Sequence, residues 1–287
     1  MLSSALKIHL EEHLGVELVR IQPVSGGSIN RTYRVSSDTT DYFLKLNDEL
    51  YYPGLFEAEA KGLNIIAGTH TVSVPGVLLQ GSVQNEAFLL LEWIEARRAA
   101  GMGAARLGEQ LASMHRVSAN HFGLKDDNYM GSLRQSNRKH SKWSDFFIAE
   151  RIQPMVSLAF DRGLLTTNDA KGFDLLFQRL PDLFNEEQPS LIHGDLWGGN
   201  YLIDVYEKPY LIDPAVCYAN READIAMTTL FGGFERNFYQ AYQQAFPLSE
   251  GWQRRIDLWN LYPLLVHLNL FGPGYLGQVK DCLKQYL

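Results

Sequence analysis

The stretch LIHGDLWGGNYLID, residues 191–204, carries the strongest signal in this sequence, and LIDP at residues 211–214 completes it. The apolar residues before the His-Gly-Asp triplet predict a short strand that delivers Asp195 to a loop. Asn200 follows five residues later, and Asp213 comes at the end of the second strand of a predicted hairpin. One carboxylate, one amide and a second carboxylate are therefore expected around one small volume.

That set of groups matches the needs of phosphoryl transfer. One carboxylate orients the attacking hydroxyl and accepts its proton, while an amide oxygen and a second carboxylate hold Mg²⁺ beside the phosphates. The alternative is a polar turn whose side chains cap nearby backbone groups. A lone His-x-Asp triplet favours that alternative, whereas the triplet together with Asn200 and Asp213 favours the catalytic interpretation.

A second signal lies in YFLKLN, residues 42–47, where Lys45 is a charge in an otherwise apolar strand. Its ammonium group could simply reach out to water. However, a helix that carries Glu57 and Glu59 follows, and this order matches the kinase layout in which a strand Lys reaches the phosphates and pairs with a helix Glu. Glu59 is the expected partner, and Glu57 is the alternative.

A Gly-rich turn precedes this strand and includes Gly26, Gly27 and Ser28. Glycines let backbone N–H groups approach phosphate oxygens closely. The turn lacks a full G-x-G-x-x-G pattern, so taken alone it favours an ordinary hairpin turn. Its place before Lys45 makes it a candidate phosphate-binding loop.

The order of expected elements indicates an α+β fold with two lobes. Residues 1–94 predict a short helix, then a small antiparallel five-stranded sheet with one main helix after its third strand. Residues 95–287 predict a larger, mostly helical lobe, interrupted by the hairpin strands NYLIDVY and PYLIDP. The expected helices of this lobe are residues 102–117, 142–162, 168–184, 221–231, 234–245 and 251–271. The polar residues 125–142 are expected to form the longest loop.

Composition narrows the possible partners of this 287-residue chain. Its net charge of −7 argues against a broad nucleic-acid-binding surface. No apolar run is long enough for a transmembrane helix, so no membrane partner is expected. The two cysteines, Cys217 and Cys282, cannot build a disulfide framework, which favours a reducing compartment. A cytoplasmic protein acting on a small molecule is the expectation.

Several longer segments resemble one known family. They are FEAEAKGL at 56–63, HGDLWGGN at 193–200, IDPAVCY at 212–218, READIAM at 221–227 and LFGPGY at 270–275. With them the chain resembles the fructosamine kinase (ketosamine-3-kinase) family, within the aminoglycoside phosphotransferase and choline kinase group. The resemblance implies a protein-kinase-like fold with ATP bound between the lobes.

The resemblance also implies a role for each matching residue. Asp195 would be the catalytic base, Asn200 and Asp213 would hold Mg²⁺, and Lys45 would contact the ATP phosphates while it pairs with Glu59. The hinge that offers backbone groups to adenine would be Glu92, Trp93 and Ile94. Trp197 would lie beside the acceptor sugar.

The activity implied by the resemblance is ATP-dependent phosphorylation of the O3 hydroxyl of a ketosamine, such as a fructosamine or ribulosamine. The unstable 3-phosphate would then release the free amine. Two alternatives stay open at this point. One is a kinase of another small acceptor, such as an amino alcohol or aminoglycoside, and the other is a non-catalytic nucleotide-binding protein.

One segment departs from the family pattern. DNYMGSLRQSNRKHSKW, residues 127–143, is more basic and less aromatic than in relatives. It is either a solvated surface loop or a part of the acceptor site that uses Arg134 and Lys139 to favour an anionic ketosamine. Two further groups are expected to be structural: Asp224, which would brace the catalytic loop, and Trp143 with its aromatic neighbours, which would pack in the core.

Overall fold

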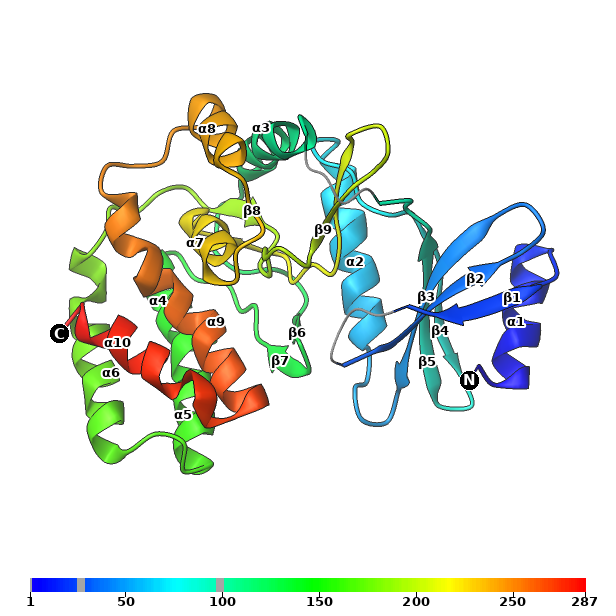
Figure 1. The fold of residues 1–287 in the computed structure, drawn as a ribbon. Coiled ribbons are helices and arrows are strands. Elements are labelled where there is room, and N and C mark those ends of the chain that lie inside the picture. The colour runs from blue at the N-terminus through cyan, green and yellow to red at the C-terminus, as the bar shows by residue number, and fades with distance from the viewer. Residues whose placement is uncertain (1, 25–28, 97–100) are drawn as a thin grey trace.

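The computed structural model describes residues 2–24, 29–96 and 101–287, and Figure 1 shows a sheet-containing part followed by a mostly helical part. The sheet contains β1 (Arg20–Pro23), β2 (Arg31–Ser36), β3 (Asp41–Asp48), β4 (Val77–Val83) and β5 (Glu86–Glu92). Its strands are antiparallel in the order β1-β2-β3-β5-β4. Helix α2 (Leu55–Gly68) follows the third strand. The expected five-stranded sheet with one helix after β3 is therefore confirmed.

Helix α1 (Ser4–Leu14) covers one face of the sheet. Ser3 caps its first turn by accepting the N–H of Leu6 at 3.2 Å, and Gly15 ends it in the left-handed conformation with φ 68°. Leu6 and Leu10, one turn apart, are fully buried against the sheet. The short helix predicted at the N-terminus is thus confirmed.

Alternation along β3 places Lys45 on the face opposite α1. Leu44 and Leu46 belong to the cluster beneath α1, so the side chain between them points to the other face. That face also carries Leu89, which pairs with Lys45 across the sheet, and it packs against α2. Figure 1 shows α2 between the sheet and the helical part. The strand period therefore aims Lys45 toward the junction of the two parts.

The helical part is built around α9 (Ile256–Phe271), whose buried residues lie on all sides of the helix. Its other helices are α3 (Gly103–His115), α4 (Trp143–Phe146), a π-helix (Phe147–Ile152), α5 (Gln153–Asp161), α6 (Thr167–Arg179), α7 (Glu222–Leu230), α8 (Arg236–Ala245) and α10 (Leu276–Lys284). Short 3₁₀ turns cover Leu180–Asp182, Trp252–Arg255 and Pro273–Tyr275. No helix among the described residues is both long and apolar enough to span a bilayer.

Two short pairs of antiparallel strands position the loops of the helical part. Strand β8 (Ser190–Ile192) pairs with β11 (Cys217–Ala219), and β9 (Tyr201–Ile203) pairs with β10 (Pro209–Leu211). The first pair carries the His-Gly-Asp triplet at the end of β8, and the second is the predicted hairpin. The segments after β8 and β10 lie next to each other, because the backbone N–H of Ala215 donates to the carbonyl oxygen of His193 at 2.9 Å.

The helical part differs from expectation in two places. The segment expected as a long loop contains a hairpin, β6 (Asn128–Met130) and β7 (Leu133–Gln135), because Asn128 and Gln135 bond to each other and Gln135 also accepts from Tyr262 at 2.5 Å. Helix α10 was not expected, because Gly272 and Gly274 interrupt the helical pattern before it. The division of the chain near residue 95 stays a prediction.

Candidate active site

A buried carboxylate holds the catalytic loop in place. Asp224 lies in the first turn of α7, is 1% exposed, and accepts the backbone N–H groups of His193 at 2.7 Å and Gly194 at 2.9 Å. Gly194 has φ 82°, and a Cβ there would lie 2.1 Å from the carbonyl oxygen of Ala215. The turn therefore requires glycine, and the bracing role expected for Asp224 is what the hydrogen bonds show.

His193 fixes the loop from within. Its Nε2–H donates to the carbonyl oxygen of Ile212 at 2.9 Å, and its Nδ1 accepts the backbone N–H of Asp195 at 3.2 Å. Burial lowers the pKa of His193, although the charge of Asp224 opposes the change. A neutral imidazole satisfies both hydrogen bonds, since one nitrogen donates while the other accepts. This side chain therefore links the catalytic loop to the segment that leads to Asp213.

Asp195 and Asn200 are in direct contact. The Nδ2 group of Asn200 donates to the backbone oxygen of Asp195 at 2.8 Å and to its Oδ2 at 2.9 Å. This turns the amide oxygen of Asn200 away from Asp195 and leaves it free to bind a cation. Burial raises the pKa of the Asp195 carboxyl to about 7, and the charge of Asp213 adds to the rise. A carboxyl with such a pKa suits proton transfer near neutral pH.

Asp213 stands two residues beyond β10 in a strained backbone conformation, with φ 55°. Non-glycine residues in the left-handed region are uncommon and concentrate at functional sites. Its Oδ1 lies 2.5 Å from the Nζ of Lys45, and its side chain is 39% exposed. The carboxylate thus combines one fixed contact with an accessible oxygen.

Lys45 sits between two carboxylates. Its Nζ also donates to Oε1 of Glu59 at 2.7 Å, whereas Glu57 pairs with Lys61 instead. Burial alone would lower the pKa of Lys45, but the charges of Asp213 and Glu59 outweigh it and raise the pKa, so the ammonium stays charged. Burial raises the pKa of Glu59 to about 7, against the opposing charge of Lys45. The structure therefore brings together the residues expected at the centre of the site.

The remaining candidates take their places around this centre. Glu92 ends β5, and its backbone N–H donates to Gly76 at 2.9 Å, so this group is already used. Trp93 follows it beneath the guanidinium of Arg34, which lies 4.5 Å from the ring centroid, and Ile94 is half-buried. Trp197 is 38% exposed beside the catalytic loop. The turn with Gly26, Gly27 and Ser28 lies outside the described residues.

Comparison with known proteins matches this chain to one family. The family model for fructosamine kinase matches residues 2–287. The chain is 39% identical to a probable ketoamine kinase of Enterococcus faecium over 270 residues, which covers 93% of this chain and 95% of the relative. It is 34% identical to the chloroplastic protein-ribulosamine 3-kinase of Arabidopsis thaliana, covering 97% of this chain and 86% of the relative. The chain belongs to the fructosamine kinase family.

Solved structures agree with this assignment. A crystal structure of a protein assigned as a fructosamine-3-kinase from Thermobifida fusca superposes with a TM-score of 0.89 at 35% identity, over 99% of both chains. A thermostable mutant of aminoglycoside phosphotransferase APH(4)-Ia superposes with a TM-score of 0.66 at 14% identity, covering 97% of this chain and 98% of the other, which shows the shared fold alone. The expected two-lobed, protein-kinase-like α+β fold is thereby confirmed. Membership of a kinase family also implies the use of ATP.

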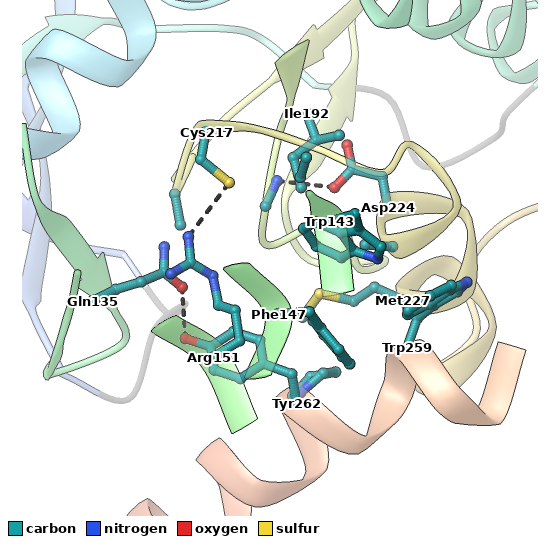
Figure 2. A pocket seen from close by; sticks show the side chains of 15 residues that line it. Gln135, Trp143, Phe147, Arg151, Ile192, Cys217, Asp224, Met227, Trp259 and Tyr262 are labelled. Atoms are coloured by element: carbon teal, nitrogen blue, oxygen red, sulfur yellow. Dashed lines mark hydrogen bonds between the residues drawn. The ribbon is translucent and has the colours of Figure 1, made fainter. Parts of the chain in front are cut away.

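In this fructosamine kinase family member, the aromatic residues of α4 and the π-helix form a core. Trp143, Phe146 and Phe147 are at most 2% exposed, as expected for packing residues. Trp143, Phe147 and Arg151 line a small cavity of about 30 Å³ (Figure 2), and Arg151 donates to Cys217 Sγ at 3.4 Å. That volume is large enough to hold water but not a substrate. Burial raises the pKa of Cys217, so this thiol is not activated.

The basic segment of this family member is partly structural. Arg138 and His140 both contact the buried carboxylate of Glu150, at 3.1 and 2.9 Å. Arg134 and Lys139 are exposed, and neither makes an ion pair with the described residues. The loop is therefore anchored by two of its charges, and the role of the other two stays a prediction.

Sequence reasoning missed His115, which forms a hydrogen bond with the Asp224 carboxylate that holds the catalytic loop. It is fully buried at the end of α3, and its Nε2–H donates to Oδ2 of Asp224 at 3.2 Å while Nδ1 contacts the hydroxyl of Tyr242 at 2.8 Å. A histidine in an apolar helix gives a weak signal, and its partner is 109 residues away. Most buried polar side chains have a hydrogen-bond partner, but sequence alone does not say which.

Proposed function

We propose that this chain is an ATP-dependent ketosamine-3-kinase that phosphorylates the O3 hydroxyl of a fructosamine or ribulosamine. The observation that carries the proposal is the convergence of Lys45, Asp195, Asn200 and Asp213 from separate segments into one site, in a member of the fructosamine kinase family. The reaction transfers the terminal phosphoryl group of ATP to a sugar hydroxyl. The phosphorylated ketosamine would then release its amine.

Asp195 is assigned as the base that receives the hydroxyl proton. As the O3–phosphorus bond forms, the bond from that phosphorus to the bridging oxygen of ATP breaks, and ADP leaves with the electron pair. The O3 proton passes to Oδ1 or Oδ2 of Asp195, whose raised pKa suits it to hold a proton near pH 7. The hydrogen bond from Asn200 fixes the orientation of this carboxyl.

Asn200 and Asp213 are assigned as the ligands of Mg²⁺. An amide oxygen turned away from its neighbour and a partly exposed carboxylate oxygen form the oxygen donor set that Mg²⁺ takes, completed by phosphates and water. The ion would neutralise charge on the phosphates. Lys45 would contact the phosphates from the sheet side while Glu59 holds it. Residues 26–28 would cover the phosphates, and the backbone of Trp93 and Ile94 would face adenine.

The test is mass spectrometry of a substrate panel incubated with Mg-ATP. The panel contains fructosamines, ribulosamines, an amino alcohol and an aminoglycoside, and Asp195→Asn protein serves as the control. We expect one added phosphoryl group on a ketosamine with the wild type and none with the variant. Phosphorylation of the amino alcohol or aminoglycoside instead would replace this proposal with the broader small-molecule kinase. ATP binding without any transfer would favour the non-catalytic alternative.

A further inference from the structure

A strip of aromatic rings begins beside the catalytic loop and runs along the helical part. The members of this aromatic strip are Trp197, Phe231, His267, Phe271 and Tyr275. Trp197 meets Phe231 at 6.1 Å between ring centroids, and Phe231 meets His267 at 4.7 Å. His267 in turn lies 5.3 Å from Phe271 and 5.1 Å from Tyr275. The catalytic loop, the end of α7 and the end of α9 thus share one continuous surface.

The strip is open to solvent. Trp197, Phe231 and Phe271 are 38%, 40% and 50% exposed. Burying a large ring is favourable, so contiguous exposed rings are retained where something binds them. None of these rings lines the core cavity of Figure 2. Because Trp197 lies two residues after Asp195 and is itself exposed, the strip offers exposed ring faces next to the catalytic loop.

The strip contains no carboxylate, ammonium or guanidinium group. The one titratable ring in its middle, His267, contacts the carbonyl oxygen of Pro263 through Nδ1 at 2.8 Å, and burial lowers its pKa. Neutral rings attract apolar groups through their faces, and those faces also attract an ammonium group. A hydroxyl or carboxylate gains little from such a surface. The chemistry of the strip therefore selects for apolar or cationic groups.

The position of the strip relates it to one part of a ketosamine. The reacting O3 hydroxyl must lie within hydrogen-bonding distance of Asp195. In a ketosamine the amine is borne on C1, next to the carbonyl carbon C2, which is itself bonded to C3. The substituent on the amine therefore leaves the sugar a short distance from O3, and Trp197 follows Asp195 by two residues.

From this placement we propose that the aromatic strip binds the substituent on the substrate's amine, and that the enzyme prefers ketosamines of amines with an apolar or aromatic group. The inference rests on the proposed function and adds the substrate class. Within the strip, Phe271 is assigned as a specificity-determining residue, and it lies at the end of α9 rather than in the catalytic loop.

The experiment compares three fructosamines with the same two-carbon spacer, made from 2-phenylethylamine, ethanolamine and β-alanine. They end in a phenyl ring, a hydroxyl and a carboxylate. We expect wild-type kcat/KM to be about five- to tenfold higher for the phenylethyl compound than for the hydroxyethyl compound. In Phe271→Ala this ratio should fall close to one, and Phe271→Tyr should restore it.

Phe160→Ala is the matched control, since Phe160 lies on α5, is 44% exposed, and is not part of the aromatic strip. It should keep the wild-type ratio. An equal kcat/KM for the phenylethyl and hydroxyethyl compounds in the wild type overturns the proposal, as does an unchanged ratio in Phe271→Ala. Preference for the β-alanine compound, lost in Arg134→Ala, overturns it in favour of the basic segment. If Phe271→Ala lowers Tm, Phe271→Leu is measured in its place.

Calorimetry separates this inference from the proposed function. The phenylethyl compound is titrated into wild type and Phe271→Ala in the presence of a non-hydrolysable ATP analogue. Weaker binding by the variant supports the strip even if no fructosamine is phosphorylated, a result that would overturn the O3-kinase assignment alone. Equal binding by both proteins, or none by either, overturns the proposal that the aromatic strip binds the amine substituent.

Discussion

The ammonium group of Lys45 lies 2.5 Å from Oδ1 of Asp213, so an ion pair joins the third strand of the sheet to the loop that follows β10. Glu59 holds the same ammonium group at 2.7 Å from the other side. Helix α2 reaches the loop so closely that a Cβ on Gly62 would lie 3.1 Å from Cγ of Pro214. The sheet, α2 and the helical part therefore meet at one buried cation.

Removal of this cation should leave two facing carboxylates without a counter-ion. We expect Lys45→Met to lower the free energy of unfolding by about 3 kcal/mol, as when one partner of a buried ion pair is deleted. Adding Glu59→Gln should recover about 1 kcal/mol, because one of the two charges is then gone. Urea unfolding measures both, with Lys45→Met/Glu57→Gln as the control. Equal stability of the two double variants would contradict the coupling.

Asp195→Asn should abolish most of the turnover. An amide cannot accept the hydroxyl proton, so we expect kcat to fall about 10²–10⁴-fold, the usual contribution of a general base. ATP binding should be nearly unchanged, because Lys45 and Asp213 remain in place. Steady-state kinetics and ATP titration measure the two quantities. Residual kcat above about a tenth of the wild-type value would show that Asp195 is not the base.

Asp213→Ala should change the response to Mg²⁺. If the carboxylate binds the ion, its loss raises the Mg²⁺ concentration needed for half-maximal activity and lowers the maximal rate. Activity is measured across a Mg²⁺ series at saturating ATP, with Glu57→Ala, an exposed acid on α2, as the matched control. The metal assignment fails if the Mg²⁺ curve of Asp213→Ala overlies that of Glu57→Ala.

Asp224→Ala should disturb the catalytic loop and leave the binding of ATP nearly unchanged. The backbone N–H groups of His193 and Gly194 would lose their acceptor, which costs about 1–3 kcal/mol for a buried group. We expect a lower Tm and a fall in kcat of at least about tenfold with little change in KM for ATP. Asp224→Asn should recover part of the stability, since one acceptor oxygen remains. A variant with wild-type kcat would show that the catalytic loop keeps its conformation without the Asp224 carboxylate.

The hydrogen bonds of Glu222 predict how the free energy of unfolding falls as the pH is lowered. Arg255 donates to it at 2.6 and 2.8 Å, and Trp259 Nε1 donates at 2.9 Å. Burial alone would raise the pKa of Glu222, but these hydrogen bonds outweigh it and lower the pKa below 4.5. Its stabilising contribution is therefore complete above the unfolded-state pKa and is lost as the pH falls through the folded-state pKa.

The measurement is the free energy of unfolding of wild type and Glu222→Gln as the pH is lowered from about 6 to about 3. The advantage of the wild type over the variant should be constant at first and shrink below the unfolded-state pKa of about 4.5. A difference that does not change with pH would mean that Glu222 titrates alike in both states.

Sequence was sufficient where the signal is local. The order of Lys45 on a strand and Glu59 on the next helix predicts their ion pair, and the spacing in residues 191–204 predicts that Asp195 and Asn200 lie close together. It was insufficient where partners come from distant segments. His115 reaches Asp224 across 109 residues, and the hairpin of residues 128–135 is fixed by a hydrogen bond from Tyr262 on α9. Such contacts depend on how elements pack, which no short pattern encodes.

Helix α7 has nine residues, with Asp224 in its first turn and Phe231 directly after its last residue. At 1.5 Å per residue the helix is about 13 Å long. The carboxylate that holds His193 and Gly194 and the ring that continues the aromatic strip therefore lie at opposite ends of one short helix. We expect substitutions of Phe231 to affect turnover as well as acceptor choice, and substitutions of Phe271, which ends α9, to affect acceptor choice.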